Sequence, residues 1–180
     1  MPKRVLCLLT DHFEEIEAIT PVDLLRRAGV EVVMASMRES IQVVGRSGIL
    51  IKADSHFASV DPTTFDLLFI PGGPAVKALR EDGRAAALAQ SFISAGKTVA
   101  AICAAPLVLH DAGLLTGKKY TAHDSTYEEL TEADPAQEVV TDGLIITSRG
   151  AGTALAFGLA LVAQLTTPEE AAKVARAIMA

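Results

Sequence analysis

Aromatic residues are scarce in this chain of 180 residues, and tryptophan is absent. Aromatic side chains make up 4% of the sequence, whereas 50% of its residues are hydrophobic. The core must therefore be built mainly from alanine, valine, leucine and isoleucine. A chain of this length can bury a sizeable core and is most simply one domain, 1–180.

The sequence has no excess of basic residues and no long hydrophobic run. Lys and Arg number 16 against 22 Asp and Glu, so the formal net charge is −6. This balance argues against nucleic acid or an anionic membrane as the main partner. No stretch reaches the roughly 18 apolar residues of a membrane span. The apolar run 5–9 is also too short for the core of a signal peptide, so we expect no membrane partner.

Cysteine is rare as well. Cys7 and Cys103 are too few for a disulfide framework, which favours a reducing, cytoplasmic location. The histidines show no metal-binding spacing and there is no CxxC pair, so we predict no metal site. The four histidines are His12, His56, His110 and His123.

Short β-rich runs alternate with longer helical patterns along the chain, which predicts a mostly parallel sheet covered by helices on both faces. Runs such as DLLFI and TVAAI are apolar throughout, as expected for strands buried on both sides. The segment 41–51 predicts a small β-hairpin with its turn at 45–48. Strands are expected at 4–9, 31–36, 66–70, 98–102, 119–121 and 144–147. Helices are expected at 14–28, 75–79, 84–95, 104–112, 125–132, 153–164 and 168–179.

Cys103 lies where the fourth of these strands would meet a helix. The carboxyl ends of parallel strands form the usual ligand-binding edge of such a sheet. Small neighbours surround Cys103, as a sharply turned nucleophile requires, and a helix amino end would favour its thiolate. A buried cysteine that only fills space is the alternative.

Two further strand ends converge on the same edge. In PGGP, the amides at Gly72 and Gly73 could stabilise an oxyanion together with the amide of Ala104, although an ordinary turn would explain the glycines. In EEIEAITP, Glu17 lies between apolar residues of a core-facing stripe. If it faces a cleft, burial would raise the pKa of its carboxyl group. A solvated glutamate is the alternative.

His123 is the histidine best placed to assist, because it ends the strand expected at 119–121 and so reaches the edge that holds Cys103. Its neighbour Asp124 would point the other way in an extended chain. His12, after the first strand, is the second candidate. His110 lies about 10 Å along the same expected helix from Cys103 and is too far.

Taken together, EEIEAITPVDLLRRAG, FIPGGP, AAICAAP and LIITSRGAGTALAF resemble the ThiJ/PfpI superfamily, in the branch of the Parkinson-disease-associated protein deglycase and its bacterial relatives. The resemblance runs over nearly the whole chain. It implies a flavodoxin-like three-layer α/β sandwich, usually a homodimer. By motif match it implies a reactive, oxidation-sensitive Cys103, a protonated Glu17 that hydrogen-bonds its sulfur, a site histidine at His123, and oxyanion-binding amides at Gly73 and Ala104.

The sequence departs from the superfamily at three places. The intracellular-protease branch has a histidine directly after its cysteine, where this chain has Ala104, so peptidase activity by that dyad is not expected. Arg46 precedes Ser47, the reverse of the usual order, so no role is transferred to Arg46. The residues after His123 also differ from those of relatives. In TSRGAGTA, Arg149 and its glycines could hold an anion or form a tight turn, but the third glycine of a dinucleotide fingerprint is missing.

The leading hypothesis is a cofactor-independent glyoxalase or deglycase, a lyase or hydrolase that acts on small reactive aldehydes such as methylglyoxal. Cys103 would attack the aldehyde, and Glu17, with His123, would move protons. The alternative is an oxidative-stress sensor or redox-activated chaperone, in which Cys103 is oxidised without turnover. The two hypotheses use the same residues, so the sequence does not separate them.

Overall fold

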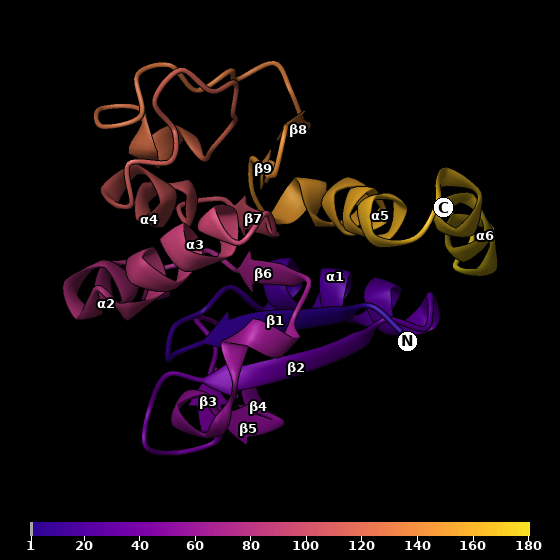
Figure 1. Ribbon diagram of the computed structural model, residues 1–180, viewed down its shortest axis with the longest axis horizontal. Helices are drawn as coiled ribbons and strands as arrows, with labels where there is room; N and C mark the ends of the chain where they lie inside the picture. The colour runs from indigo at the N-terminus through magenta and orange to yellow at the C-terminus, as the bar shows by residue number, and fades with distance from the viewer. Residues whose placement is uncertain (1) are drawn as a thin grey trace.

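A seven-stranded sheet runs through the molecule in the computed structural model, which describes residues 2–180 (Figure 1). Its strand order is β5-β2-β1-β6-β7-β9-β8, and every neighbouring pair is parallel except β8 and β9. A separate antiparallel pair, β3 and β4, forms the predicted hairpin. The strands are β1 Arg4–Leu9, β2 Glu31–Ser36, β3 Gln42–Val44, β4 Leu50–Lys52, β5 Ser55–His56, β6 Leu67–Ile70, β7 Thr98–Ile102, β8 Val139–Asp142 and β9 Ile145–Ser148.

Helices cover both faces of this sheet, which confirms the flavodoxin-like sandwich (Figure 1). The core on one face joins the strands to α1, α5 and α6, and the core on the other face joins them to α2, α3 and α4. Alternate residues of β1 enter the two cores, which is why this strand is apolar throughout. The helices are α1 Glu15–Arg27, α2 Ala75–Asp82, α3 Arg84–Ser94, α4 Pro106–Asp111, α5 Ala154–Leu165 and α6 Pro168–Ala177.

The hairpin is fastened to the start of α1. The carboxylate of Glu15, 7% exposed, accepts the N–H of Ser47 at 2.8 Å and lies 3.5 Å from the N–H of Ile49. A Cβ at Gly45 would lie 2.3 Å from Glu15 Oε1, so only glycine allows this approach. Glu15 therefore positions the hairpin, rather than acting only as an acid that complements the helix dipole.

Two elements predicted from the sequence are absent from the structure, so those predictions are wrong. Residues 119–121 form no strand, because β8 and β7 occupy both edges of β9. The backbone there instead donates to side chains: Lys119 N to Asp142 Oδ2 and Thr121 N to Thr147 Oγ1, both at 2.9 Å. Residues 125–132 form no α-helix, and only the 3-10 turn Asp124–Thr126 is present. The short strands β5 and β8 were not expected.

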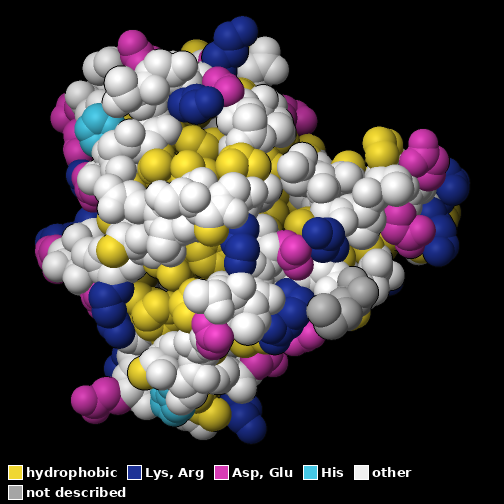
Figure 2. Space-filling view, in the orientation of Figure 1, with side chains coloured by type: hydrophobic (Ala, Val, Ile, Leu, Met, Phe, Trp, Pro, Cys, Tyr) yellow, Lys and Arg dark blue, Asp and Glu magenta, His cyan; other side chains and the backbone are white. Residues whose placement is uncertain are grey.

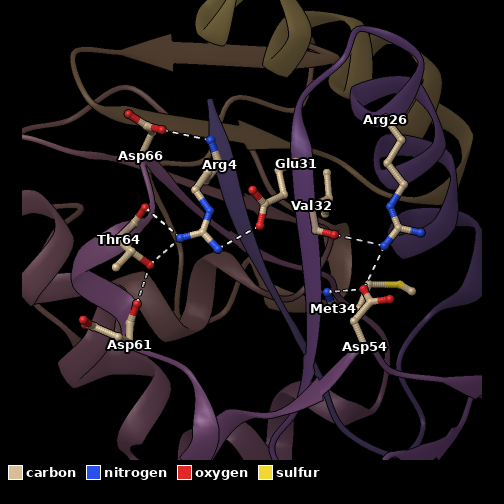
Figure 3. Close-up of polar contacts among 9 residues, drawn as sticks. All are labelled: Arg4, Arg26, Glu31, Val32, Met34, Asp54, Asp61, Thr64 and Asp66. Atoms are coloured by element: carbon tan, nitrogen blue, oxygen red, sulfur yellow. Dashed lines mark hydrogen bonds and ion pairs between the residues drawn. The ribbon is translucent and has the colours of Figure 1, made fainter. Parts of the chain in front are cut away.

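Polar contacts tie the strands together away from the carboxyl edge (Figure 3). The guanidinium of Arg4 donates to Glu31 at 2.8 Å and to Thr64 Oγ1 at 2.6 Å, so it joins β1, β2 and the segment before β6. Arg26 of α1 donates to Asp54 at 2.7 Å, and Asp54 accepts the N–H of Met34 in β2.

Acidic and basic side chains are interspersed over the face drawn in Figure 2, and neither sign forms a continuous patch there. Within residues 2–180, no helix combines the length and the apolar character needed to cross a membrane.

The contact between α1 and α5 depends on Gly158. A Cβ there would lie 2.6 Å from Leu24 Cδ1 and 3.0 Å from Pro21 Cα. We expect Gly158→Ala to lower the free energy of unfolding by about 1–2 kcal/mol, because the cost of overpacking exceeds the gain in helix propensity. Urea denaturation measures this change. Gly152→Ala, where nothing lies within 4 Å of the added Cβ, is the matched control. An unchanged Gly158→Ala protein would contradict the packing argument.

Candidate active site

Cys103 follows β7 directly and has a left-handed backbone, with φ of 65°. Two hydrogen bonds hold it there: its N–H donates to Ser148 O, and its carbonyl accepts the N–H of His123, both at 2.9 Å. The helix α4 begins only at Pro106 and has six residues. The expectation that Cys103 caps a helix starting at Ala104 is therefore wrong, and the residue lies in a strained turn before the helix.

Glu17 lies beside Cys103 and is 1% exposed. Its backbone N–H donates to Glu14 at 2.8 Å, and its Oε2 accepts the N–H of Gly72 at 3.1 Å. Burial raises the pKa of Glu17 to about 7, although hydrogen bonds with Cys103 and Gly72 oppose the rise. The expected rise in the pKa of Glu17 is present and a solvated glutamate is excluded, but the carboxyl group is buried and does not itself line a cleft.

The thiol of Cys103 does not have the lowered pKa that the sequence suggested. Burial raises its pKa to about 12, and the neighbouring Glu17 adds to the rise. The backbone N–H groups of Gly73 and Ala104 act in the opposite direction, because they hydrogen-bond to the sulfur. Cys103 and Glu17 are thus two acidic groups in contact with each other. Only the amides of Gly73 and Ala104 favour negative charge on the sulfur.

The glycines leave no space for side chains around this pair. A Cβ at Gly72 would lie 2.6 Å from both Cys103 Cβ and Glu17 Oε2. Gly73 has φ of 89°, and its Cβ would lie 2.7 Å from Glu14 N. Both positions therefore require glycine, so the close approach expected from PGGP is present.

His123 comes to the same edge, on a loop rather than at the end of a strand. Its ring Nδ1 lies 2.9 Å from Ser125 Oγ and accepts the N–H of Ser125 at 3.2 Å. Asp124 does not point away as expected: its Oδ1 lies 3.0 Å from the same Nδ1. His123 also lies against the loop after β9, because a Cβ on Gly150 would lie 3.4 Å from its Cδ2.

A cleft of about 750 Å³ opens over these residues. Cys103, Gly73, Ala104 and His123 line it, whereas His12, His56 and His110 do not. Arg80 braces its rim, because its guanidinium pairs with Asp111 of α4 and with Glu129, each through two hydrogen bonds. Among residues 2–180, no three potential metal ligands cluster closely enough to hold an ion.

The sequence reasoning missed several residues that shape the site. Arg46 lines the cleft from the hairpin turn, and its charge acts on Glu17. Ser148 was not recognised as a partner of Cys103, and Ser125 was not recognised as a partner of His123. The Ser148 contact joins residues far apart in the chain, so spacing gives no signal for it, whereas Ser125 lies two residues after His123 in a local turn that the sequence did not reveal.

The raised pKa of Glu17 has a consequence for stability. Because the folded pKa of about 7 exceeds the unfolded value near 4.5, the contribution of Glu17 is fully present below pH 4.5 and is lost as pH rises through 7. We expect Glu17→Gln to gain stability relative to the wild type by about 3 kcal/mol between these limits. Urea denaturation at several pH values measures the difference. The exposed Glu128→Gln should give a flat difference, and a flat result for Glu17→Gln would refute the raised pKa.

Comparisons with known proteins show which family the chain resembles in sequence and fold. Residues 3–164 match the model of the DJ-1/PfpI family. A deglycase of Pyrococcus abyssi is 36% identical over 157 residues, which cover 86% of this chain and 94% of the relative. The Drosophila melanogaster protein dj-1beta is 36% identical over 183 residues, covering 99% and 98%. Its crystal structure superposes with a TM-score of 0.95 over 99% of this chain and 98% of that one. The structure of oxidised DJ-1 from Toxoplasma gondii has a TM-score of 0.92 at 34% identity and covers 98% of both chains. The chain therefore belongs to the DJ-1/PfpI family.

Proposed function

We propose that this protein is a cofactor-independent glyoxalase or deglycase that converts small reactive aldehydes such as methylglyoxal into hydroxy acids. The observation that carries the proposal is the contact between half-buried Cys103, which lines an open cleft, and buried Glu17, with two backbone amides beside the sulfur. Such a pair provides a nucleophile with a general base in hydrogen-bond contact. The name deglycase, carried by the Pyrococcus abyssi relative, supports the same class of reaction.

The raised pKa values of Glu17 and Cys103 support the following first step. With a pKa of about 7, Glu17 is partly ionised at neutral pH, whereas the thiol of Cys103 is protonated. Glu17 takes the thiol proton as the sulfur attacks the aldehyde carbon, and the C–S bond forms while the carbonyl electrons move to oxygen. The amides of Gly73 and Ala104 stabilise the developing negative charge. Protonation of this oxygen by Glu17 gives a hemithioacetal.

Rearrangement and hydrolysis complete the reaction. The carboxylate of Glu17 removes the proton from the former aldehyde carbon and returns it to the neighbouring carbon. The hydroxyl proton passes to the oxygen of that neighbouring carbon as the C1 oxygen becomes a carbonyl, so the hemithioacetal becomes a thioester of lactate. Water then cleaves the thioester, releases lactate and restores the thiol. The sum is one methylglyoxal and one water to one lactate, with no net oxidation. Attack on a glycated thiol or amine by the same groups would constitute deglycase activity.

Oxidation of Cys103 is the second candidate function, as a stress sensor or redox-activated chaperone. The similar structure from Toxoplasma gondii is that of an oxidised DJ-1, and this favours the candidate. In this chain, a sulfinate on Cys103 could accept a hydrogen bond from protonated Glu17 and from the amides of Gly73 and Ala104. Oxidation would then end turnover, because the sulfur would no longer be a nucleophile.

A homodimer is the assembly we propose, with the exposed apolar side chains of three adjoining elements as its contact. Ile16 lies at the start of α1, Val44, Ile49 and Leu50 lie on or beside the hairpin strands, and Leu155 lies at the start of α5. These side chains are 38–56% exposed, an unusual grouping for a surface without a partner.

Both cysteines are free thiols, which fits a reducing, cytoplasmic location.

Lactate formation from methylglyoxal by the reduced protein tests the enzyme proposal. We expect multiple turnovers that Cys103→Ser abolishes and that Glu17→Gln reduces by about 10²- to 10⁴-fold. The pH profile of kcat/KM should rise through pH 7 as Glu17 ionises, and Glu17→Gln should lose this limb. Cys7→Ala, at a buried position in β1, is the control and should keep turning over. Absence of turnover by the reduced wild type would exclude this activity for methylglyoxal.

Sedimentation velocity tests the dimer. We expect the wild type to sediment as a dimer and Leu50→Asp to sediment as a monomer, because a buried unpaired carboxylate opposes association. Met179→Asp is the matched control, since this residue is also apolar and exposed but lies beyond the C-terminal end of α6. A wild type that stays monomeric at micromolar concentration would refute the proposed assembly.

A further inference from the structure

The ring of His123 is held by the turn that follows it in the chain. The next two residues, Asp124 and Ser125, fold back toward Nδ1 in the 3-10 turn Asp124–Thr126. Three polar atoms surround this one ring nitrogen: Ser125 N at 3.2 Å, Ser125 Oγ at 2.9 Å and Asp124 Oδ1 at 3.0 Å. The other ring nitrogen, Nε2, makes no hydrogen bond within residues 2–180.

The backbone N–H of Ser125 decides between the two neutral forms of the ring. An amide N–H only donates, so Nδ1 must present its lone pair to it, and the single ring proton then lies on Nε2. The hydroxyl of Ser125 can also donate to Nδ1 and reinforces this choice. The carboxylate of Asp124 favours the opposite form, but its side chain is 81% exposed and water competes for it. The amide is fixed by the chain, so its preference prevails.

We infer that His123 acts as a neutral hydrogen-bond donor, with Ser125 as the positioning residue that keeps the proton on Nε2. Because Nδ1 is engaged by the turn, Nε2–H is the ring group left free to donate, and His123 lines the cleft together with Ser125. From there it donates to the oxygen of a bound aldehyde or hydroxy-acid product. A base role would need the lone pair on Nε2, and this tautomer removes it.

This role of His123 rests on the proposed function and separates the tasks of His123 and Glu17 within it. Proton transfer falls to Glu17 alone, while His123 polarises the carbonyl without changing its own protonation. The two groups thereby divide the work of a general base and an electrophile. Substrates with an oxygen acceptor beside the aldehyde, such as 2-oxoaldehydes, are the class that such a donor favours.

The resting tautomer can be measured directly. In the reduced full-length protein labelled with ¹⁵N-histidine, two-bond ¹H–¹⁵N correlation at a pH where the ring is neutral should show His123 almost entirely as the Nε2–H form. Loss of its signals in His123→Gln assigns them. The ring of His110 makes no hydrogen bond within residues 2–180, so its ratio of the two neutral tautomers serves as the reference. An Nδ1–H spectrum for His123, or the same mixture as His110, would overturn the inference.

Two matched substitutions test the donor role. The side-chain amide of glutamine reaches the place of Nε2, whereas that of asparagine reaches the place of Nδ1. We expect His123→Gln to keep most of the kcat for methylglyoxal, and His123→Asn and His123→Ala to lose roughly 10²-fold. If His123→Gln is as impaired as His123→Ala, His123 is not a simple donor. If the wild type turns over no methylglyoxal, the proposed function fails for this substrate while the spectrum still decides the tautomer.

Discussion

Two backbone hydrogen bonds hold Cys103 in a left-handed conformation that costs about 1–2 kcal/mol for a residue with a Cβ. One bond comes from the end of β9, through Ser148, and the other from the loop that carries His123. The same two bonds therefore fix the nucleophile and bring the histidine segment to it. The strain is sustained because Ser148 belongs to β9 and because Thr121, two residues before His123, donates its N–H to Thr147 of the same strand.

The absence of side chains on one side of the site is as important as the groups that are present. Glu17 can approach Cys103 only because Gly72 leaves the space between β6 and α1 empty. The amide of Gly72 also donates to Glu17 Oε2, so the residue that makes room orients the carboxyl group as well. Packing of α1 against α5 through Gly158 holds the helix that delivers Glu17.

The sequence predicts the sheet well and the loop region poorly, for physical reasons. Strands buried on both faces, such as 4–9 and 98–102, have unbroken apolar runs, and their bounds agree with β1 and β7. No strand forms at 119–121, because the N–H groups of Lys119 and Thr121 bond to side chains of β8 and β9, which no local pattern reveals. Cys103, Glu17 and His123 do meet at the predicted edge. Of the partners that orient them, Ser148 is distant in the chain from Cys103, and Ser125 reaches His123 through a local 3-10 turn.

For the thiol of Cys103, the sequence pattern predicts a lowered pKa, whereas the structure raises it. A helix amino end would have lowered it, but α4 starts three residues later, and burial beside an acid dominates. The proposed reaction therefore does not start from a resting thiolate. In it, a proton passes from Cys103 to Glu17, so the carboxyl group that raises the thiol pKa is also the group proposed to activate the thiol. Such a nucleophile is protected from chance electrophiles until a carbonyl is positioned in the cleft to accept the sulfur.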